Sequence, residues 1–381
     1  MLKMQPFDSP ILVTRPYFPP IEQFKGELEK IWQNQYLTNN GPMLREFQAK
    51  LSEYLNISTD NIDLFNNGTS ALEIGLYVLG LSGGDVITTP FTFVATAHAI
   101  KRIGANPVFA DVDPENLCLD PEACEKLITP RTKAIVPVHV YGHPCDVKGF
   151  EALSQKYGVK IIYDAAHAFG VKLAGKSIAA YGDMSMFSFH PTKLFHSCEG
   201  GLLAFADHGL QAKLEQLRNF AILSETQCVD VGTNAKMNEL QAAMGNLCLK
   251  VIDRLIAYRR SIHETYENAF ADCKNIRMVK VTSSRSASKD LALVRNDAYC
   301  PVLFKDFEIR EKVYAELKKY NVYSRRYFYP LLTDFTPYIN GNATPAARDA
   351  AARVLTLPTY DNLNLKDVEK IAAIVKEIAG E

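Results

Sequence analysis

Hydrophobic and polar residues alternate in short blocks between residues 62 and 205, and these blocks predict strands and helices in turn. Amphipathic stretches, with apolar residues at i, i+3 and i+4, predict helices at 71–79, 92–103 and 147–157. Short apolar runs between them are typical of strands buried on both faces, and they occupy 62–65, 86–90, 107–111, 134–140, 160–164, 184–189 and 202–205. The alternation predicts an α/β fold with a mostly parallel central sheet flanked by helices.

Outside residues 62–205, hydrophobic and polar residues do not alternate in short blocks. Two amphipathic helices are predicted before the alternation, at 21–32 and 44–55, with a polar loop at 37–42 between them. After the alternation, the pattern predicts one long helix at 237–266 and a polar loop at 283–297. It then predicts a strand at 299–304 and helices at 308–320 and 365–378. We therefore expect two domains, a large one with an N-terminal arm at 1–250 and a smaller α/β domain at 251–381.

Composition narrows the class of protein. The 381 residues include 42 Lys and Arg against 43 Asp and Glu, a net charge of −1, which gives no electrostatic footprint for nucleic acid or an anionic membrane. No run of 18 or more apolar residues predicts a membrane helix, and the proline-broken first 20 residues do not resemble a signal peptide. The eight cysteines show no zinc spacing. We expect a cytoplasmic enzyme with reduced thiols and no metal.

Polar residues follow the carboxyl ends of several predicted strands, where open parallel sheets bind ligands. Asp164 ends one strand, and Lys193 lies just beyond another. Gly68, Thr69 and Ser70 open a helix, where backbone amides can bind an anion. Each feature alone has an ordinary interpretation: a salt bridge or cap, a solvated lysine and an N-cap. Together they fit pyridoxal phosphate, which needs a lysine for a Schiff base, an acid for the pyridine nitrogen and a helix N-terminus for the phosphate.

Three motifs carry a resemblance to a known family. The motifs are Asp164-Ala-Ala-His167, Ser188-Phe-His-Pro-Thr-Lys193 and Glu199-Gly-Gly201. They resemble the corresponding motifs of the DegT-type nucleotide-sugar aminotransferases, which are fold-type-I enzymes that use pyridoxal phosphate. The resemblance extends over nearly the whole chain, from residue 37 to residue 330. The run from Lys193 to Gly201 is most similar to the branch that aminates C4 of dTDP-4-keto-6-deoxyglucose.

The resemblance implies a role for each matching position. Lys193 would form the Schiff base and move the proton, and Asp164 would pair with the pyridine nitrogen. The other cofactor contacts would come from a stacking ring, a histidine by the ring oxygen, four phosphate-binding residues and an asparagine reaching over from the neighbouring subunit: Phe93, His167, Gly68, Thr69, Ser70, Ser188 and Asn234. The nucleotide-sugar would be bound near Thr38, Asn39, Tyr327 and Tyr329, with Arg325 or Arg326 meeting a carboxylate or diphosphate.

The implied reaction has two halves. L-Glutamate would convert the cofactor to pyridoxamine phosphate and leave as 2-oxoglutarate, and the amine would then pass to the nucleotide-linked keto-sugar, giving a dTDP-4-amino-4,6-dideoxyglucose destined for an O-antigen-type lipopolysaccharide. A homodimer with shared active sites is also implied. Amination of a 3-keto-sugar, an axial (galacto) C4 amine and sugar dehydration remain as alternatives; because Lys193 is present, transfer is favoured over dehydration. The balanced charge argues against a DNA-binding regulator that senses the cofactor.

Overall fold

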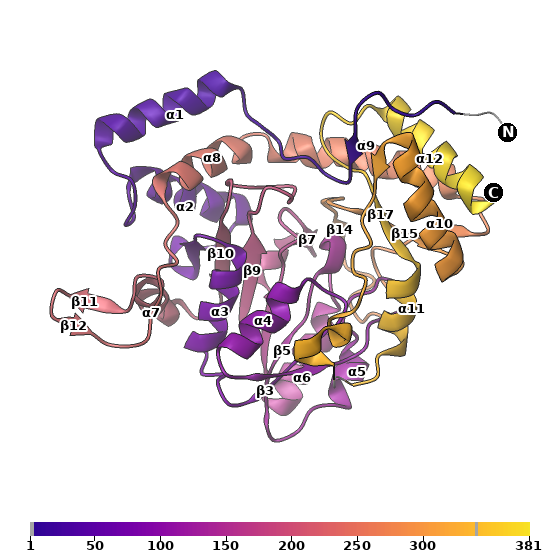
Figure 1. The fold of residues 1–381 in the computed structure, drawn as a ribbon. Coiled ribbons are helices and arrows are strands. Elements are labelled where there is room, and N and C mark those ends of the chain that lie inside the picture. The colour runs from indigo at the N-terminus through magenta and orange to yellow at the C-terminus, as the bar shows by residue number, and fades with distance from the viewer. Residues whose placement is uncertain (1–3, 340–341) are drawn as a thin grey trace.

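A central sheet of seven strands organises the computed structural model, which describes residues 4–339 and 342–381 (Figure 1). Six strands run in one direction, and only β10 is antiparallel to its neighbours. In spatial order the strands are β2 (Ile62–Phe65), β10 (Gly201–Phe205), β9 (Met184–Ser188), β6 (Lys160–Asp164), β5 (Thr132–Val136), β3 (Asp85–Thr88) and β4 (Asn106–Phe109). The predicted fold class, a mostly parallel sheet flanked by helices, is confirmed.

Helices cover both faces of this sheet, which explains why its strands are apolar at consecutive positions. Ile161 and Tyr163 of β6 join one apolar cluster, whereas Ile162 between them joins the other. The first cluster includes α2 (Pro42–Leu55), α5 (Pro121–Glu125), α6 (Val147–Tyr157) and α8 (Glu239–Leu249). The second includes α3 (Gly68–Val78), α4 (Val94–Arg102) and α7 (Gln211–Leu217). The strands of the central sheet are therefore held between two layers of helices.

A smaller antiparallel sheet contributes to a third apolar cluster in the C-terminal part of the chain. Its strands are β13 (Ile276–Met278), β15 (Cys300–Phe304) and β17 (Val354–Leu357), with β15 in the centre. It packs with α9 (Ile252–Phe270), α10 (Phe307–Leu317) and α12 (Leu365–Ala379), and α11 (Pro345–Arg353) packs against α10 and β15. The division into domains at residue 250 stays a prediction.

Short elements complete the fold. Helix α1 (Ile21–Asn34) lies at one end of the molecule in Figure 1, and the N-terminal strand β1 (Ile11–Leu12) pairs in parallel with β16 (Val322–Tyr323) at the other. A two-stranded hairpin, β11 (Ile222–Ser224) with β12 (Gln227–Cys228), projects near α7. Strands β7 (Lys172–Leu173), β8 (Lys176–Ser177) and β14 (Leu293–Val294) form a small third sheet. None of the helices within the described ranges has the length and apolar character needed to cross a membrane.

The prediction of one long helix over 237–266 is wrong. The chain forms α8 and α9 instead, and the break falls at Val251, whose φ of −121° leaves the helical range. Apolar residues continue through the break, so periodicity alone does not reveal it. Its effect is to give the two helices different partners, because α8 packs on α2 and α9 packs on α12.

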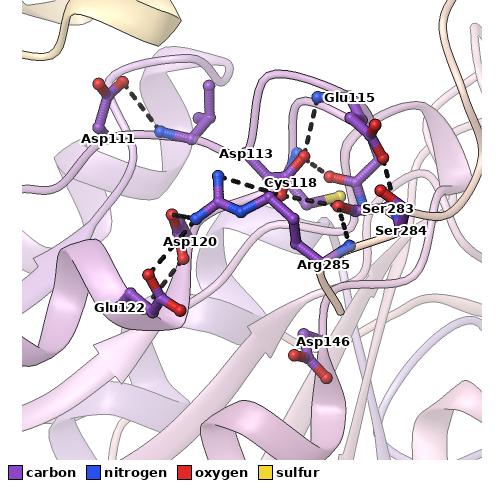
Figure 2. Close-up of polar contacts among 12 residues, drawn as sticks. Asp111, Asp113, Glu115, Cys118, Asp120, Glu122, Asp146, Ser283, Ser284 and Arg285 are labelled. Carbon is purple, nitrogen blue, oxygen red and sulfur yellow. Dashed lines mark hydrogen bonds and ion pairs between the residues drawn. The ribbon is translucent and has the colours of Figure 1, made fainter. Parts of the chain in front are cut away.

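The predicted loop 283–297 is irregular except for β14, and polar contacts hold its first half against the segment 113–146 (Figure 2). Ser283 donates a hydrogen bond to Asp113 at 2.8 Å. Arg285 lies 3.2 Å from a carboxylate oxygen of Asp120 and 3.4 Å from one of Glu122. The connection between β13 and β15 is therefore anchored rather than loose, although it lacks regular structure.

Candidate active site

The predicted site residues come from strands whose carboxyl ends meet at one edge of the central sheet. The pairing register places Gly201 opposite both Phe65, the last residue of β2, and Ser188, the last residue of β9. A methyl group added to Gly68 would lie 3.0 Å from the Cβ of Ser188, so the turn after β2 and the end of β9 are in close contact. Parallel strand direction thus brings together residues more than 100 positions apart in sequence.

The N-terminus of α3 presents backbone amides at this edge. Asn67 caps the helix by accepting a hydrogen bond from the Ser70 amide at 2.8 Å. The amides of Gly68 and Thr69 form no hydrogen bond to any part of the chain that the structure describes. Together with the helix dipole they suit an anion such as a phosphate, whereas the Ser70 amide is already used by the cap.

Asp164 is a buried carboxylate at the end of β6, only 4% exposed. One oxygen accepts a hydrogen bond from the Thr96 hydroxyl at 2.7 Å, and the other accepts one from the Ala166 amide at 3.1 Å. No ion pair joins it to a described residue, and burial raises its pKa above the usual 3.8, an effect that these two donors and the charge of Lys193 oppose only in part. A cationic ring nitrogen would supply the missing partner, so the residue fits the cofactor that the sequence predicts.

Lys193 lies partly buried in the turn after β9. Its Nζ is 3.4 Å from the hydroxyl of Tyr299. Burial lowers the pKa of the amine to about 8, while Asp164 and Tyr327 act in the opposite direction. At neutral pH roughly a tenth of such amines are unprotonated, which is far more than for an exposed lysine. The amine is therefore suited to nucleophilic and acid–base chemistry.

His167 is buried at the same edge and has a defined hydrogen-bonding state. Its Nδ1 accepts a hydrogen bond from the Tyr141 amide at 3.0 Å, so the proton of the neutral ring is on Nε2. Burial, with the nearby charge of Lys193, lowers the pKa of His167 well below 6.5 and keeps the ring neutral. Its Nε2–H is then a donor for an oxygen of a bound ring.

Two other residues predicted to contact the cofactor, Phe93 and Asn234, are exposed on the protein surface. Phe93 is 59% exposed at the N-cap of α4, the helix that carries Thr96, so its ring is free to stack on a ligand. Asn234 is also exposed, and its carbonyl accepts a hydrogen bond from Asn66 at 3.3 Å, beside the turn that precedes α3. Its role in a neighbouring subunit stays a prediction.

The predicted substrate residues fall into two groups. Tyr327 lies near the lysine, since its ring centroid is 6.3 Å from that of Tyr299. Tyr329 follows it and packs over the guanidinium of Arg310, 4.5 Å from its ring centroid. Thr38 and Asn39 are exposed in the loop between α1 and α2, and no side-chain hydrogen bond within the described part of the chain joins them to Lys193.

The two candidate arginines differ in what already binds them. Arg326 makes two hydrogen bonds to Glu311, at 3.0 and 3.1 Å, and lies over the ring of Tyr314. Arg325 is exposed, and its side chain forms no ion pair within the described ranges. Arg325 is therefore the more available of the two for an anionic substrate group.

Sequence reasoning missed two residues of this edge. Thr96 is 68 positions from Asp164, and only the packing of α4 against the sheet brings it there. Tyr299 is 106 positions from Lys193 and follows a segment without periodicity. Thr92, whose hydroxyl lies 3.1 Å from that of Thr96, precedes the N-cap of α4, so the local sequence does not reveal the role of Thr96.

Comparison with known proteins agrees with this geometry. Residues 20–376 match the DegT/DnrJ/EryC1/StrS aminotransferase family. A dTDP-4-amino-4,6-dideoxy-D-glucose transaminase from Shigella dysenteriae is 41% identical over 376 residues, which cover 97% of this chain and all of the relative. The crystal structure of DesI in the presence of its TDP-sugar product superposes with a TM-score of 0.91 at 32% identity, covering 99% of this chain and 94% of that one. The structure of NtdA from Bacillus subtilis with bound cofactor PMP gives a TM-score of 0.85 at 26% identity, covering 95% of this chain and 82% of that one.

Proposed function

Because this chain belongs to the DegT/DnrJ/EryC1/StrS aminotransferase family, we propose that it aminates C4 of dTDP-4-keto-6-deoxy-D-glucose with L-glutamate as donor, giving dTDP-4-amino-4,6-dideoxy-D-glucose and 2-oxoglutarate. The chain is a pyridoxal-phosphate-dependent sugar aminotransferase, as the sequence predicts. The main observation in support of the proposal is that Asp164, Lys193 and the N-terminus of α3 lie at the same edge of the central sheet. The Shigella relative supports the choice of sugar.

Each side chain of this edge has a distinct part. When bound, the cofactor supplies an electron sink for negative charge that develops on the neighbouring carbon. Asp164 would hold the ring nitrogen in its protonated form, and the amides of Gly68 and Thr69, with Ser188, would hold the phosphate. His167 would donate from Nε2 to the ring oxygen. Lys193 would bind the cofactor and move the proton at its Nζ.

The first test is spectroscopic. Purified protein loaded with pyridoxal phosphate should show a visible absorption band that L-glutamate removes and that dTDP-4-keto-6-deoxy-D-glucose restores, because the two substrates act on the cofactor in opposite directions. The product is then identified by nuclear magnetic resonance, which separates C4 from C3 amination and equatorial from axial amines. D-Glutamate is the control for the donor. A band that glutamate leaves unchanged would exclude this donor, and recovery only with a 3-keto-sugar would replace the proposed acceptor.

We also infer a homodimer with shared active sites. Helix α1 and the β11–β12 hairpin lie on the same side of the molecule in Figure 1. Each of these regions has an exposed large apolar side chain, since Trp32 is 69% exposed and Val231 is 85% exposed, and exposed apolar surface is typical of interfaces. Two-fold dimers are the commonest oligomers. A partner seated there would cover the hairpin and bring its Asn234 toward the neighbouring site.

The proposed dimer interface can be tested separately by placing a charge in it. Val231→Asp places a charge in the proposed interface and should shift the protein toward monomer, which light scattering after size-exclusion chromatography measures over a range of concentrations. Val294→Asp on β14 is the matched control, since Val294 is 49% exposed and lies in a different sheet. An unchanged dimer in Val231→Asp, or an equal loss in Val294→Asp, would contradict this interface.

We further propose that the enzyme acts in the cytoplasm and that its aminosugar enters an O-antigen-type lipopolysaccharide. The name of the Shigella relative supports the identity of the aminosugar, and its destination and the compartment rest on the family resemblance of the sequence motifs. Deletion of the gene should then remove the 4-amino-4,6-dideoxyglucose residue from the purified surface polysaccharide of the source organism.

A further inference from the structure

The hydroxyl of Tyr299 lies beside the amine of Lys193, with 3.4 Å between Oη and Nζ. Tyr299 comes immediately before β15, and its side chain is almost completely buried. The oxygen has no other hydrogen-bond partner among the described residues. Its ring packs at 4.6 Å from the ring of His167, between centroids. Among residues 4–339 and 342–381, the contact with the lysine is therefore the only hydrogen bond of this buried hydroxyl.

The backbone on either side of Tyr299 is fixed. Arg259 of α9 donates a hydrogen bond to the Ala298 carbonyl at 2.8 Å. The side-chain amide of Asn296 donates to the carbonyl oxygens of His167 and Phe169, at 2.8 and 3.0 Å. Farther upstream, Arg285 and its acidic neighbours hold the same segment (Figure 2). Tyr299 is thus attached to the loop that follows Asp164, and its hydroxyl has a set position relative to Lys193.

Four groups face the Lys193 amine: Asp164 from β6, His167 from the loop after it, Tyr327 from the segment after β16, and Tyr299. His167 stays neutral, and Asp164 acts on the amine through its charge. Burial raises the pKa of Tyr327, so its hydroxyl is neutral, and neither Asp164 nor Tyr327 forms a hydrogen bond to Nζ in the described structure. Burial raises the pKa of Tyr299, so its hydroxyl remains protonated at every working pH. A neutral hydroxyl accepts a hydrogen bond most strongly from a charged donor.

We propose that Tyr299 is a positioning residue that receives the amine of Lys193 whenever that amine is free, and that it favours the protonated form. The inference rests on the proposed role of Lys193. In a two-stage transfer the lysine is free while the cofactor is in its amino form, and it must then carry one proton without moving away from the site. Without the hydroxyl, two acceptors would remain among the groups that face the ammonium. One is the Tyr327 hydroxyl, which forms no hydrogen bond to Nζ in the described structure, and the other is the Asp164 carboxylate, which Thr96 and Ala166 already engage.

The experiment measures the protonation of Lys193 directly. The full-length protein is loaded with pyridoxamine phosphate, which leaves the lysine free, and is labelled with trace acetic anhydride at a series of pH values. Peptide mass spectrometry then gives the labelling midpoint of Lys193. We expect the midpoint in Tyr299→Phe to be lower than in the unmodified protein by about one pH unit, since a charged hydrogen bond is lost while the ring packing is retained. Tyr338→Phe, which removes a hydroxyl bonded to His98 at 2.6 Å, is the matched control.

The outcomes separate the two claims. A downward shift in Tyr299→Phe alone supports the inference. No shift, an upward shift, or an equal shift in Tyr338→Phe would overturn it while leaving the proposed function intact. If Lys193 in the unmodified protein labels with the midpoint of an ordinary exposed lysine, the proposed role of Lys193 fails as well. Midpoints of the other lysines, read from the same digest, report any general change in structure.

Discussion

Lys193→Ala should abolish amino transfer, with a loss of at least about a thousandfold in kcat/KM, because it removes both the group that binds the cofactor and the base that moves the proton. Lys193 is the lysine at the carboxyl edge of the sheet whose pKa is lowered, to about 8, by burial near Asp164. Lys236, which pairs with Phe65 at the same edge, has its amine bonded to Asn219 and Asn234. His167 is held neutral with its Nδ1 already bonded to Tyr141, so neither residue is placed to replace Lys193. Turnover is measured with the keto-sugar and L-glutamate.

A second readout separates chemistry from folding. After borohydride reduction, the unmodified protein should retain the cofactor covalently on the peptide that contains Lys193, and the alanine variant should release it. Lys172→Ala, an exposed lysine on β7, is the control and should keep both the activity and the covalent mass. Partial recovery of the alanine variant by a small primary amine would support loss of a base rather than loss of structure. Turnover like that of the unmodified protein would rule out Lys193 as the catalytic amine.

Sequence alone locates Asp164 and Lys193 because parallel strands impose a rule that needs no tertiary knowledge. Each residue stands at or just after the end of an apolar run, and all such ends of one direction reach the same sheet edge. The same rule places the turn at Gly68. The antiparallel β10 does not disturb it, because β10 begins at this edge with Gly201.

Residues that act through packing are harder to predict. Thr96 lies within α4, and nothing in the local sequence connects it with Asp164; only the contact in the folded chain identifies it. Tyr299 depends on the anchored segment 283–297, whose contacts join residues far apart in the sequence. The break at Val251 has a similar cause, since α8 and α9 follow different packing partners while the apolar pattern continues. Local sequence patterns predict where strands end and which helix faces are buried. Positions that depend on contacts between residues far apart in the sequence cannot be predicted from those patterns.

Asp164→Asn should reduce kcat/KM by about a hundredfold or more and weaken the binding of pyridoxal phosphate, because the ring nitrogen loses its anionic partner. The substitution is sterically mild. The amide oxygen can still accept from the Ala166 amide, and the amide nitrogen can donate to the Thr96 hydroxyl. Thr96 can then turn its own proton toward Thr92, whose oxygen is 3.1 Å away. Absorption titration with the cofactor measures the affinity.

The same change should stabilise the cofactor-free protein at neutral pH. Burial raises the pKa of Asp164 in the folded chain above its value of 3.8 in the unfolded chain. The folded state therefore binds the proton more tightly, and the free energy of unfolding falls as the pH rises from about 4 through the raised pKa. Asparagine carries no such penalty. We expect melting temperatures that agree near pH 4 and separate at higher pH, with Asp164→Asn higher by about 2 °C at pH 7.

Asp183→Asn is the matched control. Asp183 precedes β9, and its carboxylate contacts the first residues of β6, where it accepts hydrogen bonds from the Ile161 amide at 2.9 Å and the Lys160 ammonium at 2.7 Å. This carboxylate already has a cationic partner, so its loss should leave the melting temperature equal or lower and the activity intact. Asp164→Asn that lowers the melting temperature of the cofactor-free protein at pH 7 would mean that the chain itself compensates the buried charge. The fit between Asp164 and the cofactor rests on the opposite result: the folded chain holds an anion at a cost, and the bound ring nitrogen offsets it.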